Sequence, residues 1–325
     1  MHAETDSAAK KRIAAVIPCY RETERILGVL AGIGDEVERI YVIDDACPDG
    51  TGDLVEESCS DPRVTVLKLS ENKGVGGATL AGYRRAIDDK MDVIVKLDGD
   101  GQMNPRELHK LVRPIVSGQA DYAKGNRFHS VESVSAMPKV RLFGNLFLSF
   151  ATKMSSGYWN IFDPTNGYTA IDRRVAELLP VAKIDNGYFF ESDMLFRLNT
   201  LRAVVADVPI PAIYGDERSS LVIWKILMPF LGKNIANTFR RLIYSYFLRD
   251  FTIASVELIA GLILIGFALI FGGVHWYDSI TTNVPASTGT IILPTVTFLV
   301  GMQLFLGFLN FDTRNVPTTA LHLDL

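Results

Sequence analysis

The segment Asp98-Gly99-Asp100 places two carboxylates directly after a short apolar run, Asp92–Leu97. In an extended chain the side chains of residues i and i+2 project to the same side, so both carboxylates can face one ligand. Carboxylate oxygens are hard ligands for divalent cations, and a cation held there can neutralise the charge that develops on a departing diphosphate. The pair therefore predicts a metal-assisted transfer site, with a plain Asp-Gly turn after a strand as the alternative.

A second acidic group, Asp44-Asp45, also follows an apolar run and leads into the turn sequence Pro48-Asp49-Gly50. Two adjacent carboxylates at the end of a strand are unfavourable unless something binds them. A carboxylate in this place can accept hydrogen bonds from a base or from a ribose hydroxyl. The alternative interpretation is a turn followed by a helix cap.

The glycine-rich segment Asn72–Ala78 opens a predicted helix. Its glycine spacing fits neither the phosphate loop of nucleoside triphosphatases nor the dinucleotide-binding fingerprint. We therefore interpret the segment as a close approach of the backbone beside a ligand, and we exclude NAD binding.

The elements that must position these residues alternate between strands and helices. Helices are expected between the strands because Thr23–Leu30, Gly52–Ser58 and Gly77–Asp89 are compatible with helical structure. Such alternation predicts a parallel, doubly wound sheet, whose ligands bind beyond the carboxyl ends of the strands. Four Val- and Ile-rich runs are predicted as buried strands: Ile13–Pro18, Ile40–Ile43, Val64–Leu67 and Asp92–Leu97.

The carboxyl-terminal third has the composition of a membrane anchor. Phe251–Gly273 and Thr290–Phe311 are each long enough to span a hydrocarbon core. No Lys or Arg occurs between Phe251 and Asp312, whereas basic residues flank both ends, which places both ends in the cytoplasm. Leu221–Leu248 mixes aromatic and basic residues, as helices in the headgroup region do. The alternatives are a pair of buried core helices and an ordinary amphipathic helix.

Length, charge and the amino terminus narrow the class further. The 325 residues suit one catalytic domain with an addition, and the net charge of −4 excludes the strongly basic balance of a nucleic-acid-binding protein. Residues 1–12 are polar and carry no apolar leader, so we expect the first domain to stay in the cytosol. We expect a cytosolic catalytic domain over residues 1–220, amphipathic juxtamembrane helices over 221–250, a two-helix transmembrane hairpin over 251–313 and a cytoplasmic tail over 314–325.

Taken together, the motifs resemble glycosyltransferase family 2, over residues 13 to about 220. More narrowly, the chain resembles the polyprenyl-phosphate glycosyltransferases, the group that contains dolichyl-phosphate mannose synthase and bacterial undecaprenyl-phosphate sugar transferases. The resemblance implies a GT-A domain, a mostly parallel sheet flanked by helices. The segments that carry it are Ile17-Pro18-Cys19-Tyr20-Arg21-Glu22, Ile43-Asp44-Asp45 with Asp49-Gly50-Thr51, Asn72-Lys73-Gly74 and Asp98-Gly99-Asp100.

The resemblance also implies residue roles. It implies a Mg²⁺ or Mn²⁺ ion near Asp98, Asp100 and Gln102. It implies phosphate-facing arginines at Arg127, Arg141 and Arg218, although a solvated helix arginine remains the alternative for Arg141. Asp193, in Glu191-Ser192-Asp193, falls where related transferases keep a catalytic carboxylate, which acts as a base or orients the sugar or a phosphate. The implied nucleotide-binding residues are Pro18, Tyr20, Glu22, Asp45 and Lys73.

The function expected from the resemblance is a metal-dependent, inverting hexosyltransferase. It would move a sugar from a UDP- or GDP-linked donor to a polyprenyl phosphate, undecaprenyl phosphate in bacteria, at the cytoplasmic face of the inner (plasma) membrane. The anchor would make it a multi-pass protein, and the resemblance suggests a homotetramer. Two alternatives remain. A processive polysaccharide synthase shares this front half but carries a Q-x-x-R-W element that is absent here, and a non-catalytic membrane scaffold could retain the same fold.

Overall fold

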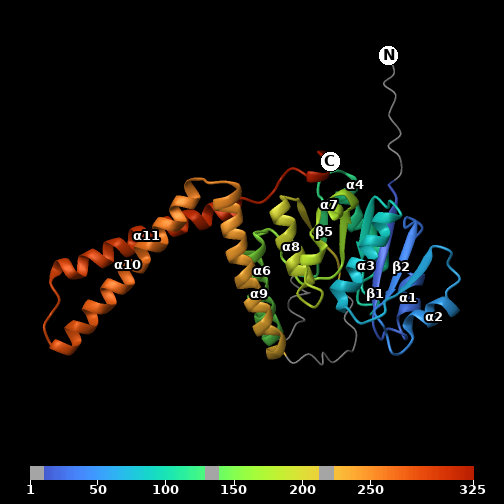
Figure 1. Cartoon of the computed structure of the whole chain (residues 1–325), viewed down its shortest axis with the longest axis horizontal. Helices are drawn as coiled ribbons and strands as arrows, with labels where there is room; N and C mark the ends of the chain where they lie inside the picture. The colour runs from blue at the N-terminus through green and yellow to red at the C-terminus, as the bar shows by residue number, and fades with distance from the viewer. Residues whose placement is uncertain (1–10, 129–138, 212–222) are drawn as a thin grey trace, which may run out of the picture. The chain divides into compact units, whose positions relative to one another are not determined.

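The computed structural model describes residues 11–128, 139–211 and 223–325, and it divides into two compact units (Figure 1). The first unit comprises the chain up to Thr238 together with Pro317–Leu325. The second comprises Phe239–Val316. Arg218 therefore lies outside the described residues, and the side chain of Arg141 is not described either.

One mostly parallel sheet forms the centre of the first unit, as predicted. Within the described residues it has seven strands in the order β3-β2-β1-β4-β6-β5-β7. Strand β6 (Thr169–Asp172) runs antiparallel to both of its neighbours, and β5 (Tyr122–Asn126) pairs in parallel with β7 (Val205–Pro209). The four predicted strands are confirmed as parallel neighbours: β1 (Ile13–Cys19), β2 (Arg39–Asp44), β3 (Val64–Lys68) and β4 (Val93–Lys96).

Helices cover both faces of this sheet. Apolar side chains of α1 (Ile26–Ala31), α2 (Thr51–Ser58) and α4 (Leu108–Val116) form one core with the strands. Helix α3 (Gly74–Asp88) packs against β1 and β2, and it begins at Gly74 rather than at the predicted Gly77. Further helices of this unit are α6 (Lys139–Ser156), α7 (Arg173–Leu178) and α8 (Phe190–Leu201), with short 3₁₀ turns η1 (Pro105–Glu107), η2 (Val181–Lys183) and η4 (Leu321–Leu323).

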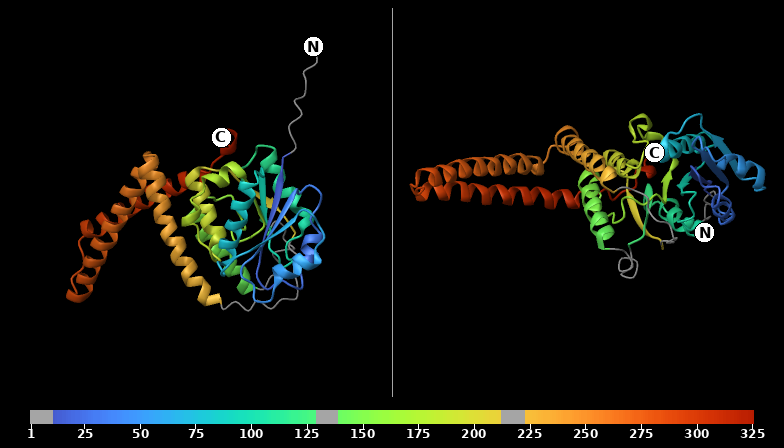
Figure 2. Two further views of the ribbon diagram at one scale, coloured as in Figure 1. Left: turned by 45° about the vertical axis from the view of Figure 1, so that its right-hand side comes forward. Right: turned by 90° about the horizontal axis from the view of Figure 1, so that it is seen from below.

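The second unit is a helical hairpin that begins with the end of α9 (Ile223–Ile243) and a π-helical turn, η3 (Tyr244–Arg249). Helices α10 (Ile253–Thr282) and α11 (Thr288–Arg314) lie side by side (Figure 2), and both are long and apolar enough to cross a membrane. Helix α10 continues nine residues beyond the predicted end of the first span, because it ends only where Asn283 takes a left-handed conformation.

Small residues and one buried ion pair hold the hairpin together. A Cβ atom on Gly301 would lie 2.9 Å from the backbone nitrogen of Ile265, so the two helices approach each other through this glycine. At the base of the hairpin, Arg241 Nη1 and Nη2 donate to the two carboxylate oxygens of Asp312 over 2.6 and 3.0 Å. Tyr246 donates its hydroxyl to the same carboxylate. A bidentate pair of this kind fixes both distance and orientation.

The last residues of the chain return to the first unit, where η4 packs against α7. The fully buried carboxylate of Asp121 accepts hydrogen bonds from the backbone of Leu321 and from the backbone and ring of His322. The tail that follows the hairpin is thus an integral part of the first unit.

Candidate functional site

The loops after β1 and β4 bring two of the sequence motifs together. Pro18 lies buried in β1, Tyr20 is exposed just beyond the end of the strand, and Glu22 follows in the same loop. A Cβ atom on Gly99 would lie 3.5 Å from Glu22 Cγ and 3.0 Å from Cys19 Sγ. The glycine between the two aspartates therefore allows the first loop to pack directly against the acidic motif.

The two aspartates after β2 have different surroundings. Asp44 accepts hydrogen bonds from the backbone nitrogens of Cys47 (2.7 Å) and Gly52 (2.6 Å), so it closes the turn and caps α2. Asp45 is buried and accepts a hydrogen bond from the backbone nitrogen of Lys73 over 2.7 Å. The turn-and-cap interpretation is therefore right for Asp44, whereas Asp45 joins the glycine-rich segment to this edge of the sheet.

The glycines of Asn72–Ala78 serve contacts within the protein. The backbone nitrogens of Gly76 and Gly77 both donate to the carbonyl oxygen of Asn186, over 2.9 and 3.2 Å. A Cβ atom on Gly76 would lie 2.5 Å from the carbonyl oxygen of Asp185, so no side chain fits there. The close backbone approach expected of this segment is therefore made, at Gly76 and Gly77, to residues 185–186, and a ligand beside it stays a prediction.

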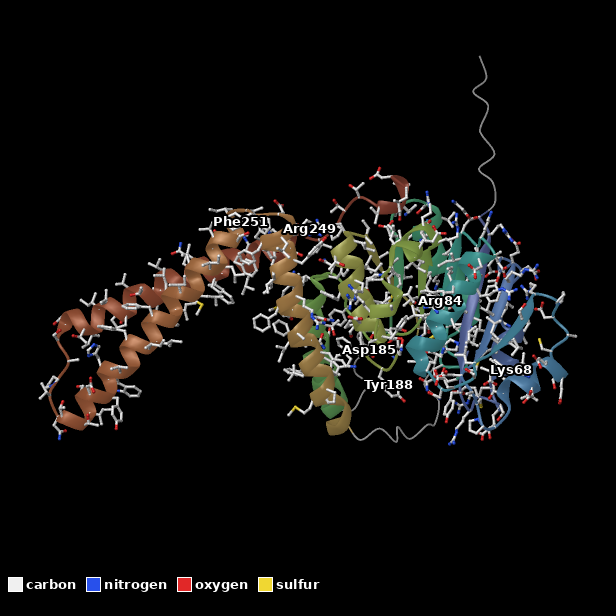
Figure 3. The ribbon with its side chains drawn as sticks, in the orientation of Figure 1. Lys68, Arg84, Asp185, Tyr188, Arg249 and Phe251 are labelled. Carbon is white, nitrogen blue, oxygen red and sulfur yellow. The ribbon has the colours of Figure 1, made fainter. Side chains whose placement is uncertain are left out.

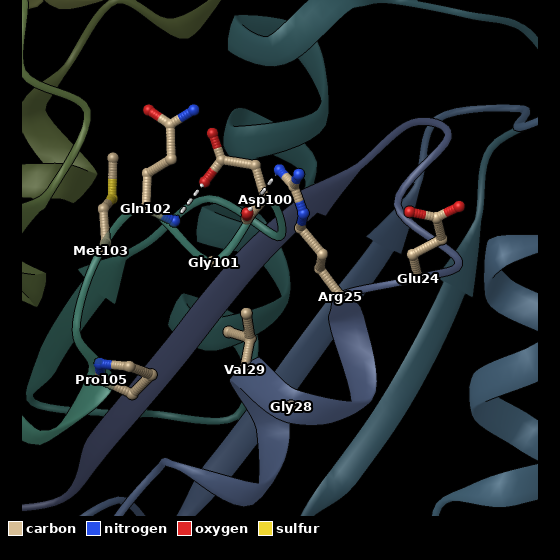
Figure 4. Close-up of a pocket in the computed structure, with 9 residues that line it drawn as sticks. All are labelled: Glu24, Arg25, Gly28, Val29, Asp100, Gly101, Gln102, Met103 and Pro105. Carbon is tan, nitrogen blue, oxygen red and sulfur yellow. Dashed lines mark hydrogen bonds between the residues drawn. The ribbon is translucent and has the colours of Figure 1, made fainter. Parts of the chain in front are cut away.

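The acidic motif after β4 turns through Gly101, whose φ of 73° favours glycine. The backbone nitrogen of Gln102 donates to Asp100 Oδ1 over 2.9 Å, and Arg25 Nη1 donates to the carbonyl oxygen of Asp100 over 3.2 Å. Asp100 and Gln102 are among the residues that line a pocket of about 400 Å³ (Figure 4). The pocket is lined by Glu24, Arg25, Gly28, Val29, Asp100, Gly101, Gln102, Met103 and Pro105.

Asp98 has a different partner from Asp100. Lys96 Nζ lies 2.9 Å from Asp98 Oδ1 and also donates to Glu191 Oε1 over 2.9 Å. Burial lowers the pKa of Lys96, but Asp98 and Glu191 outweigh burial and raise the pKa above its ordinary value. Asp98 thus contacts the buried ammonium group of Lys96. Lys96 and Glu191 are site residues that the sequence analysis missed. A lysine among the apolar residues of a strand was the available signal.

The donor set of the acidic motif fits a hard divalent cation. Asp98, Asp100 and Gln102 offer carboxylate and amide oxygens within one loop, and Mg²⁺ and Mn²⁺ prefer such ligands. In the part of the chain that the structure describes, no group of three or more His, Cys, Asp or Glu side chains could hold a metal ion. Metal binding at Asp98, Asp100 and Gln102 stays a prediction.

Arg127 is held by an acidic partner. Its Nε and Nη2 donate to the two oxygens of the buried Asp163 over 2.7 and 3.1 Å, and a third of its side chain is exposed. The pair fixes the plane of the guanidinium, and Asp163 is a third residue that the sequence analysis missed. Arg141 lies on α6, and its role as a phosphate ligand, like that of Arg218, stays a prediction.

Asp193 is buried and hydrogen-bonded on both oxygens. Oδ2 accepts from the backbone nitrogen of Asp185 over 3.1 Å, and Oδ1 accepts from Asn237 Nδ2 over 2.9 Å. Asp185 lies just before the start of α8 (Figure 3) and is also paired with Lys233. In this structure Asp193 therefore positions the turn before α8, and its action as a base stays a prediction.

Comparison with known proteins gives the following matches. Residues 14–179 match the family model described as Glycosyl transferase family 2. The undecaprenyl-phosphate mannosyltransferase of Micrococcus luteus is 32% identical over 233 residues, which cover 70% of this chain and 93% of that protein. The UDP-N-acetylglucosamine–dolichyl-phosphate N-acetylglucosaminyltransferase of Methanococcus voltae is 29% identical over 248 residues, covering 69% of this chain and 98% of that protein.

A solved structure has the same fold. The glucosyl-3-phosphoglycerate synthase of Mycobacterium tuberculosis in complex with UDP superposes with a TM-score of 0.52 at 20% identity, over 71% of this chain and 80% of the synthase. The same synthase has also been solved with Mn²⁺ and UDP.

Proposed function

Since the chain belongs to glycosyl transferase family 2, and within it to the polyprenyl-phosphate glycosyltransferases, we propose that it transfers a sugar from a nucleoside-diphosphate donor to a polyprenyl phosphate. The observation that carries the proposal is the convergence of Glu22, Asp45 and the Asp98–Asp100 motif at one edge of the sheet, in a chain whose relatives are named for this reaction. The product would be a polyprenyl-phosphate-linked sugar.

The donor would lie over the loops after β1, β2 and β4. Tyr20 is exposed there and can stack on a base, while Asp45 and Glu22 can accept hydrogen bonds from the base or the ribose. Pro18 and Lys73 would complete this wall. A synthase of the same fold has been solved in complex with UDP, which agrees with a nucleotide-linked donor.

Asp98, Asp100 and Gln102 would hold a Mg²⁺ or Mn²⁺ ion. The ion, when bound, supplies charge neutralisation for the departing diphosphate. Arg127 would add a planar fork for a phosphate group, because its pair with Asp163 already fixes its orientation. Arg141 and Arg218 are proposed as further phosphate ligands.

The acceptor needs little help from a base. A phosphate monoester has a second pKa near 6 and is largely ionised at neutral pH, so its oxygen can attack the anomeric carbon without losing a proton first. This agrees with Asp193, whose oxygens both accept hydrogen bonds from the protein. Attack opposite the diphosphate inverts the anomeric centre, so an α-linked donor would give a β-linked product.

A membrane location is supported by two surfaces. Helices α10 and α11 have the length and composition of membrane spans. In the first unit, α9 buries polar side chains and exposes apolar ones, the reverse of a typical soluble helix. Asn234 and Asn237 are buried, while Met228 and Ile235 are exposed. On α6, which is joined to α9 by a hydrogen bond between Ser155 and Asn234, Leu146, Phe147 and Phe150 are also exposed. Exposed apolar surface on a domain whose chain continues into membrane spans is typical of a domain that meets lipid.

The cytoplasmic orientation has separate support. No Lys or Arg occurs between Phe251 and Asp312, whereas Arg241, Arg249 and Arg314 flank this stretch. Both ends of the hairpin connect to the first unit, because Pro317–Leu325 packs there. A hairpin that spans a membrane would therefore have both ends on the side of that unit, and the charge bias favours the cytoplasm.

The proposal is tested by incubating the full chain, purified in detergent, with undecaprenyl phosphate and a panel of UDP- and GDP-linked sugars. We expect mass spectrometry to find one glycolipid, the lipid phosphate plus one sugar. Asp100→Asn should lose at least a hundredfold in rate, while Asp53→Asn, which removes a surface carboxylate paired with Lys68, should not. Donor consumption without a lipid product would contradict the proposal.

A further inference from the structure

A lysine is buried directly beneath the acidic motif. Lys96 ends β4, its side chain is 1% exposed, and its ammonium lies 2.9 Å from an oxygen of Asp98 and 2.9 Å from an oxygen of Glu191. Glu191 belongs to the first turn of α8. One ammonium group thus connects the helix on this face of the sheet to the first aspartate of the motif.

If any one of Lys96, Asp98 and Glu191 were removed, the two that remain would be in an unfavourable state. A buried ammonium needs partners, and Asp98 and Glu191 would repel each other if the cation between them were removed. The preceding residues of the strand, Val93, Ile94 and Val95, are apolar and buried. A charged side chain at the end of this strand therefore calls for a role at the site rather than in the core.

Gly167 provides the space that the pair needs. A Cβ atom on Gly167 would lie 2.5 Å from Lys96 Nζ and 2.7 Å from Asp98 Oδ2. The backbone of Gly167 is not in the left-handed region, so the missing side chain, and not an unusual φ, is what this position requires. This contact is independent of the ion pair, and it concerns both of the side chains that form the pair.

The turn that carries Gly167 cannot easily move away. Lys124, buried on the neighbouring strand, donates to the carbonyl oxygen of Asn166. Asn166 in turn donates through Nδ2 to the carbonyl oxygen of Gly125 over 2.8 Å, and its Oδ1 accepts from the backbone nitrogen of Tyr168 over 3.0 Å. A methyl group added at Gly167 would therefore displace the side chains of Lys96 and Asp98 rather than the turn.

We propose that Lys96, Glu191 and Gly167 are positioning residues of the metal site. Glu191 holds the ammonium of Lys96, the ammonium holds the carboxylate of Asp98 in one orientation, and Gly167 leaves room for both. The motif is thereby ordered before a cation and a diphosphate arrive, so binding does not have to order it. The inference rests on the proposed metal-dependent transfer.

The test uses two variants that act in different ways. Lys96→Met removes the ammonium but keeps the length of the side chain, and Gly167→Ala keeps every charge but adds one methyl group. Lys68→Met is the matched control, because it removes an exposed lysine that pairs with Asp53 and Glu56 on the surface. Mn²⁺ binding to each full-length variant is measured by titration calorimetry in the presence of UDP and, separately, of GDP.

We expect Mn²⁺ to bind at least tenfold more weakly to Lys96→Met and Gly167→Ala, and unchanged to Lys68→Met. Sugar transfer by Gly167→Ala should require correspondingly more Mn²⁺ and recover most of its kcat at saturation. If Lys96→Met does not fold, Gly167→Ala decides alone.

Unchanged Mn²⁺ affinity in a folded Gly167→Ala that transfers sugar normally would overturn the inference and leave the proposed function intact. A wild-type chain that binds neither Mn²⁺ with nucleotide nor transfers sugar would overturn both.

Discussion

Replacing His322 by alanine tests whether the end of the chain closes the first unit. The carboxylate of Asp121 is fully buried, and its Oδ1 lies 2.7 Å from His322 Nδ1 and 2.8 Å from the backbone nitrogen of His322. Its Oδ2 accepts from the backbone nitrogens of Val204 (2.7 Å) and Leu321 (2.8 Å). A carboxylate only accepts, so Nδ1 carries the proton.

The magnitude follows from the number of bonds lost. His322→Ala removes one of four donors, and a hydrogen bond to a charged group contributes about 1.5–3 kcal/mol. Removing residues 317–325 takes away three donors and opens Asp121 to water, so we expect a loss of at least about 3 kcal/mol. For a domain of this size, each kcal/mol lost from the free energy of unfolding lowers the melting temperature by about 2–4 °C. The expected decreases are about 3–12 °C for His322→Ala and at least about 6 °C for the truncation.

The assay is thermal unfolding of the purified chain in detergent, followed by tryptophan fluorescence. His109→Ala is the control, because His109 is exposed and its ring contacts the carbonyl oxygen of Arg106, which lies three residues earlier. A truncated chain that melts within 1 °C of the wild type would refute the reasoning. So would rapid cleavage of residues 317–325 by a protease in the folded protein, since a docked segment resists cleavage.

Three further predictions concern buried groups. Burial lowers the pKa of Lys124 from 10.5 to about 8. Below pH 8 the native state therefore carries a desolvated ammonium, which lowers the free energy of unfolding. This loss disappears as the pH rises from 8 to 10.5. Lys124→Met should therefore be more stable at pH 7, by at most about 3 kcal/mol, with a difference that shrinks toward pH 10 in urea unfolding. Asp163→Asn should lower kcat/KM for sugar transfer at least tenfold, because Arg127 loses its ionised partner. The assay is run well below the melting temperature of the variant, and a kcat/KM equal to that of the wild type would contradict the prediction. Gly301→Val should lower the melting temperature by several degrees, whereas Gly266→Val, where a Cβ meets nothing within 4 Å, should not.

The parallel half of the fold was predictable because its strands are short, apolar and bounded by turns. Runs such as Ile40–Ile43 are buried on both faces of the sheet, which gives them an apolar composition. The antiparallel strand β6 was not predicted. Its place between β4 and β5 depends on pairing with residues about 50–80 positions away, and local composition does not carry that information.

The sequence predicted the site residues that belong to a motif, but not the partners that packing brings into contact with them. Asp98 and Asp100 look equivalent in sequence, yet only Asp98 contacts the buried Lys96. Glu191 and Asp193 are two residues apart on α8, yet Glu191 contacts the ammonium of Lys96 while Asp193 contacts Asn237 of α9. Residues that look alike in the sequence therefore differ in role, because the fold gives each of them a different partner.

The most direct test of the account is the metal dependence of glycolipid formation. The full chain is incubated with undecaprenyl phosphate and its preferred nucleotide sugar in Mn²⁺ or in EDTA, and the lipid product is quantified by mass spectrometry. We expect product in Mn²⁺, almost none in EDTA, and almost none with Asp100→Asn in either condition. Equal product in EDTA, or an Asp100→Asn variant as active as the wild type, would contradict it.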